Sequence, residues 1–212
     1  MAEIFEKPKA FTKEWFSYVW EYYKWYIICG IVAIVLAVFT YNDIKNTVKY
    51  DTNINFVATG VITSEKADII AAKCAENSED LNDNGRVDIS FTQLNFTEEN
   101  RNNSEMNYAL TNKLMALFAT QEELIFITDS YMLGQLEKMN GESDIFINAS
   151  EWAADDMITD GNLAVSLAES TVLREVGIDS SDMYVVLARA DYEDGLNAEE
   201  INARKIAEFL IK

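Results

Sequence analysis

The chain has 212 residues, of which 49% are hydrophobic and 25% charged, a composition that argues against disorder and fits one domain with an anchor. Its formal net charge is −19, and all of it lies beyond residue 42, where 13 basic and 32 acidic side chains stand. An acidic domain of this kind repels phosphate backbones, so nucleic-acid binding is not expected. It tolerates cations and basic partner surfaces, although solubility alone also explains such a charge.

An apolar segment near the N-terminus predicts a transmembrane helix. Residues 25–42 hold no charged side chain, and most of them form the run WYIICGIVAIVLAVFTY. Flanking residues extend this run toward the roughly 20 residues that a bilayer requires. The run also lacks the polar stripe that a surface helix of a soluble domain shows.

Aromatic side chains are concentrated just before this run, with eight of them between residues 15 and 26. Such a cluster is typical of the membrane interface, and a packing surface for another helix is the alternative. No small-residue cleavage pattern follows the run, so we expect an uncleaved signal anchor. Four lysines precede the predicted span and two follow it closely, which favours a cytoplasmic N-terminus. The four are Lys7, Lys9, Lys13 and Lys24, and the two are Lys45 and Lys49.

The expected organisation therefore has four parts. They are a cytoplasmic aromatic-rich juxtamembrane segment (1–24), a transmembrane helix (25–42), a connector (43–50) and an extracytoplasmic domain (51–212).

Strand and helix patterns alternate along the outer domain. Strands are predicted near 53–59, 87–96, 124–127, 145–147, 162–167 and 183–190, and helices near 64–76, 104–120 and 130–139, with a helical turn at 150–157. Asn197 and Glu200 form a capping-box pattern for a last helix. This alternation predicts a single three-layer α/β domain with a mainly parallel sheet.

The segment DLNDNGRVD resembles the first nine positions of a calcium-binding loop and the start of a dockerin loop. Gly85 stands where the loop turns, but Phe91 occupies the position of the usual bidentate acid. The alternative is an Asn-Gly turn that needs no metal. The candidate calcium ligands are Asp80, Asn82, Asn84, Arg86 and Asp88.

Polar residues follow two of the predicted strands, where open α/β sheets place ligands. The candidate ligand-binding residues are Thr59, Gly60, Thr128, Asp129 and Ser130. The alternative for Asp129 or Ser130 is a helix cap. The chain contains no histidine and no evident pair of catalytic carboxylates, so we expect a protein that is not an enzyme.

Several segments together carry a family resemblance: WEYYKWYII, DLNDNGRVDIS, LIFITDS, MYVVLARA and NAEEINARKIAEFLIK. With them the chain resembles membrane-anchored extracytoplasmic proteins of Gram-positive anaerobes that are similar to one lobe of periplasmic solute-binding proteins. The resemblance implies a solute-binding-protein-like α/β fold. We therefore expect a membrane-tethered binding or scaffolding module for a protein partner or small solute, or alternatively a reduced solute-binding component of a transporter.

Overall fold

The computed structural model describes residues 11–46, 49–120, 123–143, 145–154, 157–159, 161–189 and 198–212. The chain divides into two compact units, Met1–Val48 and Lys49–Lys212. The predicted cap at Asn197 and the lysines Lys7 and Lys9 lie outside the described residues.

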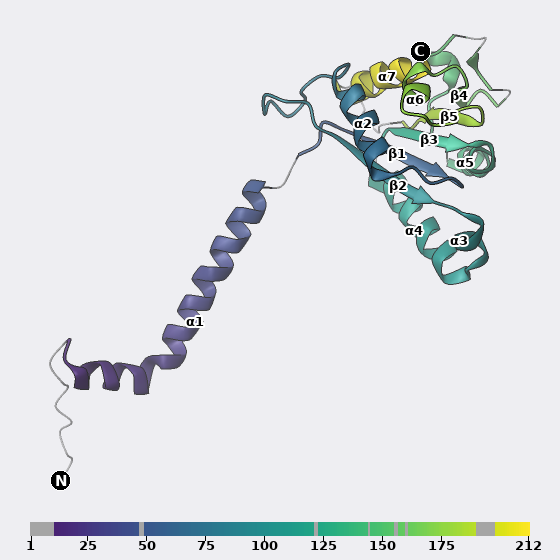
Figure 1. Cartoon of the computed structure of the whole chain (residues 1–212). Coiled ribbons are helices and arrows are strands. Elements are labelled where there is room, and N and C mark those ends of the chain that lie inside the picture. The colour runs from purple at the N-terminus through teal and green to yellow at the C-terminus, as the bar shows by residue number, and fades with distance from the viewer. Residues whose placement is uncertain are drawn as a thin grey trace. The chain divides into compact units, whose positions relative to one another are not determined.

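The first unit is built on one long helix, α1 (Lys13–Asn46). The hydroxyl of Thr12 accepts a hydrogen bond from the N–H of Trp15 at 3.3 Å, which satisfies one of the unpaired donors of the first turn. No proline interrupts residues 13–46, so the helix takes in both the predicted span and the aromatic segment before it. Figure 1 shows that α1 is bent in its N-terminal part.

The apolar surface of α1 is uncovered. The segment Trp15–Asn42 is long and apolar enough to cross a membrane, with a mean hydropathy of 2.0, and none of its most apolar part is buried in protein. Trp25 is 70% exposed, Tyr26 77% and Phe39 68%. A core helix of a soluble domain would be mostly buried, whereas an anchor or a signal sequence has this uncovered composition.

The second unit contains a five-stranded sheet with the order β2-β1-β3-β5-β4. Its strands are β1 (Thr52–Ala58), β2 (Ile89–Asn95), β3 (Ile125–Asp129), β4 (Ala164–Ser166) and β5 (Met183–Leu187). Strand β1 lies in parallel between β2 and β3, with Ile54 opposite Phe91 and Ile125. The carboxyl ends of these three strands therefore meet at one edge of the sheet.

The other half of the sheet is antiparallel, so the prediction of a mainly parallel sheet is confirmed only for β1, β2 and β3. Strand β5 runs antiparallel to both β3 and β4. Strands β4 and β5 are consecutive in the chain and adjacent in the sheet, and the short helix α6 (Thr171–Glu175) in their connection is not the full crossover helix that usually joins parallel neighbours.

Helices cover both faces of the sheet and make three layers (Figure 1). One face packs on α2 (Ser64–Ala75), α6 and α7 (Ala198–Ile211), and the other on α4 (Ser104–Thr120) and α5 (Ser130–Ser143). The short helix α3 (Glu98–Asn102), which the sequence did not predict, precedes α4 and is capped by Thr97.

Strand alternation sorts side chains between the two cores. Ile54 and Phe56 of β1 point to the α2 and α7 side, while Val57 points to the α4 and α5 side. In β3, Phe126 contributes to the second core, where its ring stands edge-on to Phe146 with 6.1 Å between ring centroids. The predicted strand at 145–147 is reduced to a single bridge between Phe146 and Ala188.

Candidate functional site

The ends of β1 and β3 bring two of the predicted site residues together. Thr59 donates to Asp129 Oδ2 from its backbone N–H at 2.6 Å and from its hydroxyl at 2.5 Å. The other carboxylate oxygen of Asp129 accepts the N–H of Met132 at 2.9 Å and so caps α5. Both oxygens of a side chain that is only 8% exposed therefore take part in the fold.

The neighbouring candidates are also held by protein contacts. Thr128 is fully buried, and its hydroxyl donates to the carbonyl of Asp129 at 3.4 Å. The Ser130 hydroxyl donates to Asp182 at 2.9 Å, just before β5. These contacts connect the carboxyl end of β3 to the elements on either side of it. Among the five predicted residues, Gly60 is the one that lines the pocket described next.

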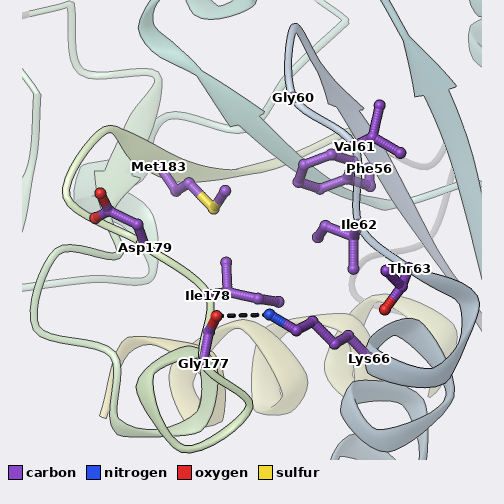
Figure 2. Close-up of a pocket in the computed structure, with 10 residues that line it drawn as sticks. All are labelled: Phe56, Gly60, Val61, Ile62, Thr63, Lys66, Gly177, Ile178, Asp179 and Met183. Atoms are coloured by element: carbon purple, nitrogen blue, oxygen red, sulfur yellow. Dashed lines mark hydrogen bonds between the residues drawn. The ribbon is translucent and has the colours of Figure 1, made fainter.

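A pocket with a volume of about 240 Å³ lies beside this junction. Its walls are Phe56 of β1, residues 60–63, Lys66 of α2, residues 177–179 and Met183 of β5 (Figure 2). Most of these side chains are apolar, and Lys66 and Asp179 are the charged residues in the lining. Sequence reasoning missed this site because residues 177–179 come from the connection between α6 and β5, for which no pattern predicted a contact with α2.

Lys66 and Gly177 meet at one side of this pocket. The ammonium of Lys66 donates to the Gly177 carbonyl at 2.6 Å, as the dashed line in Figure 2 shows. Gly177 follows α6 in the left-handed conformation, with φ of 70°. Its N–H donates to the carbonyl of Arg174 and that of Ile178 to the carbonyl of Leu173, both at 2.9 Å. These two bonds close the end of α6 and fix the carbonyl that Lys66 contacts.

The second charged residue, Asp179, interacts locally. Its carboxylate accepts the N–H of Ser181 at 3.1 Å. Hydrogen bonds from the Ser181 side chain and backbone lower the pKa of Asp179 below its ordinary value, so this carboxylate stays ionised near neutral pH. In Figure 2 its carboxylate points away from Lys66.

The loop of predicted calcium ligands folds into a compact turn. Asp80 accepts the N–H groups of Asn84 and Gly85, the latter at 2.7 Å, and the side chain of Asn84 accepts the N–H of Arg86 at 3.0 Å. Gly85 has φ of 85°, as the predicted turn requires. Asp88 pairs with Arg86 at 2.5 Å.

Several oxygens of this loop therefore accept backbone N–H groups, among them those of Asp80 and the side-chain oxygen of Asn82. Phe91 lies in β2 and faces the core, stacked on Phe56 with 6.3 Å between ring centroids. No cluster of three or more acidic, histidine or cysteine side chains suited to a metal occurs among the residues that the structure describes. Calcium binding stays a prediction.

Asp51, which no sequence pattern singled out, lies outside this loop and holds it in place by hydrogen bonds. It is 7% exposed, and its Oδ1 accepts the N–H groups of Leu81 at 2.8 Å and Asn82 at 3.1 Å. Its Oδ2 accepts the N–H of Asp88 at 2.8 Å. The Asn82 side chain donates to the carbonyl of Lys49 at 2.9 Å. The loop is thus bound to the start of β1, immediately after the connector.

Comparison with protein-family models, curated proteins and solved structures found no match.

Proposed function

We propose that this protein is a membrane-tethered, non-enzymatic binding module whose acidic domain works on the outer face of the membrane. The observation that supports this is the uncovered apolar surface of α1, no part of whose most apolar stretch is buried. In water this surface is unfavourably hydrated, and a bilayer covers it along the length of about 20 residues.

The lysine distribution supports the orientation. Lys13 and Lys24 belong to the group of four before the span, against Lys45 and Lys49 after it, and positively charged flanks stay in the cytoplasm. The net charge of −19 lies in the residues after the span, so in this orientation the domain presents an acidic surface outside the cell. Such a surface favours partners with basic patches.

The chemistry of the domain supports binding over catalysis. Its cysteine, Cys74, is fully buried on the inner side of α2, and burial raises the pKa of the thiol to about 12. That thiol is protonated at neutral pH and does not serve as a nucleophile. The Asp129 carboxylate, at the strand ends where a reacting group would be expected, is occupied by Thr59 and Met132.

A specific observation favours the second candidate, a reduced solute-binding component of a transporter. The pocket near the carboxyl end of β1 is concave and mostly apolar with few polar groups, as small-molecule sites are. The three-layer domain is compatible with one lobe of a solute-binding protein. Tethering would keep either kind of module close to membrane partners and raise its effective concentration there.

Single-cysteine labelling in intact cells tests the tether and its orientation. In a Cys29→Ala background the buried Cys74 gives little reaction, and that parent is the control. A membrane-impermeant maleimide is expected to label Glu169→Cys in intact cells, and Lys13→Cys only after permeabilisation, because both positions are exposed but lie on opposite sides of the span.

Two results would contradict the proposal. The reverse labelling pattern would place the domain in the cytoplasm. Release of the chain from membranes by alkaline carbonate would show that α1 is not an integral anchor.

A further inference from the structure

We propose that the pocket between α2 and the α6–β5 connection binds a small apolar carboxylate, with Lys66 as the group that contacts its charge. This inference rests on the proposed function as a binding module and names the chemical class of the ligand. The observation that carries it is one ammonium group beside apolar walls in a small, open pocket.

The walls of the pocket determine that the part of the ligand held there is apolar. Phe56 is fully buried and Ile62 is 6% exposed, so they form a firm apolar base. Ile178 and Met183 are half-buried and pack against the same core from the opposite side. Figure 2 shows these four side chains around one space. An apolar group placed there would be removed from water, which is the main source of affinity in small apolar sites.

The volume limits the part of a ligand that the pocket can hold. The pocket has about 240 Å³ of space, less than the 300–1,000 Å³ typical of sites for drug-sized ligands. Because the pocket is open to solvent on one side, it suits the branched apolar end of a short carboxylic acid and does not enclose a whole ligand.

Lys66 determines the charge of the ligand. An ammonium carries three N–H donors, and the Gly177 carbonyl accepts from one of them at 2.6 Å. That bond holds the lysine head at the pocket, so less side-chain freedom is lost when an anion binds. The N-terminus of α2, which lies beside Lys66, adds a partial positive charge. Asp179 also lines the pocket, but its carboxylate accepts the N–H of Ser181 and points away from Lys66.

The acidic character of the whole domain opposes anions only weakly at this point. Exposed charges more than about 8–10 Å away are largely screened at physiological ionic strength, whereas a contact with Lys66 is not. The local donor therefore decides the sign of the ligand.

A ligand-observed NMR titration of the full chain in nanodiscs tests the proposal, with empty nanodiscs as the reference for partitioning into lipid. The probes are 4-methylpentanoate, the neutral 4-methylpentanamide and the cationic 4-methylpentylamine, which share one carbon skeleton. We expect binding of the carboxylate and at least roughly tenfold weaker binding of the other two. Equal affinity for all three, or no binding of the carboxylate, would overturn the proposal.

Amino-acid substitutions test whether the ligand binds in this pocket. Lys66→Met is expected to weaken carboxylate binding roughly tenfold or more, and Lys66→Arg to retain it within a few-fold, because the charge is kept. Lys113→Met removes an exposed lysine from α4 and should leave binding unchanged. Ile178→Trp fills the cavity and should abolish binding of every probe while the chain stays folded by circular dichroism.

Unchanged affinity in both Lys66→Met and Ile178→Trp would place the ligand elsewhere and overturn the assignment. The proposed function is tested by a separate measurement, the labelling of Lys13→Cys and Glu169→Cys. That labelling does not depend on any ligand, so a failure of the ligand proposal can be distinguished from a failure of the proposed function.

Discussion

Asp129 joins the ends of two parallel strands through Thr59, which donates both its backbone N–H and its hydroxyl to one carboxylate oxygen at 2.6 and 2.5 Å. The same side chain caps α5 through Met132. One carboxylate therefore fixes β1, β3 and the start of a helix. Because Asp129 is 8% exposed, water replaces these hydrogen bonds poorly when they are lost.

We expect Asp129→Ala to lower the free energy of unfolding by about 3 kcal/mol, and Thr59→Val by about 1 kcal/mol, since the latter keeps the backbone bond. Urea unfolding followed by circular dichroism measures both. Thr111→Val is the control, because the hydroxyl it removes contacts only the exposed Asn107 carbonyl within α4. An Asp129→Ala variant as stable as this control would show that the junction contributes nothing.

Asp51 holds residues 81–88 through three backbone N–H groups. In Asp51→Asn the amide replaces one acceptor oxygen with a donor, so we expect a loss of about 2–3 kcal/mol and faster exchange of those amides. Hydrogen exchange read by NMR at Leu81, Asn82 and Asp88 measures this loosening directly. Asp68→Asn, at an exposed position on α2, should leave these rates unchanged.

The sequence prediction of calcium binding is tested by calorimetric titration of the chelator-treated chain. A binding heat is expected in the native chain and not in the Asp80→Ala, Asn82→Ala double variant, because both positions supply loop oxygens. Asp83→Asn is the matched control, since it changes an acid of the same loop that occupies no ligand position and keeps its φ of 55° accessible. Superimposable traces for the native chain and the double variant would contradict the prediction.

The ion pair between Lys73 and Glu175, 2.7 Å apart, connects α2 to α6 at an exposed site. The hydrogen bond and charge of Lys73 lower the pKa of Glu175 below 4.5, and those of Glu175 raise the pKa of Lys73 above 10.5. The ion pair therefore contributes to the free energy of unfolding at pH values between the ordinary pKa values of the two groups. The contribution is lost as pH falls through the folded-state pKa of Glu175 or rises through that of Lys73.

The Tm difference between the native chain and Glu175→Gln should thus be small but constant near neutral pH and should vanish in acid. Glu208→Gln, at an exposed position on α7, corrects for the removal of one negative charge from an acidic domain. A difference that persists in acid, below the folded-state pKa of Glu175, would mean that the substitution acts through packing and not through the ion pair.

Local patterns in the sequence predicted the elements of the domain well. The apolar spacing of Ala67, Ile70, Ala71 and Cys74 predicts the inner side of the helix near 64–76, and in α2 three of them are buried while Ala71 is half-buried. The helix after Ser104 also has the predicted bounds. Such signals succeed because burial repeats at the period of the element and needs no knowledge of distant residues.

Strand direction and the sites depended on distant contacts, which no local pattern contains. The antiparallel direction of β5 is defined by its pairing with β3 and β4, which lie far from it or beyond a loop in the sequence. Lys66 and Gly177 stand 111 positions apart, and Asp51 reaches amides 30 to 37 positions further along. In the sequence, Asp51 is one of 36 acidic residues and Lys66 one of 17 basic ones, and only folding distinguishes them.

The attachment of loop 80–88 to Lys49 and Asp51 has a mechanical consequence. If α1 is the proposed anchor, a pull transmitted along the chain reaches the domain at Lys49 and Asp51, next to β1, the strand paired on both sides by β2 and β3. A force along a doubly paired strand loads its ladder hydrogen bonds together in shear, which resists more than peeling them one by one. Asp51 would thus hold loop 80–88 at the point where the proposed tether meets the domain.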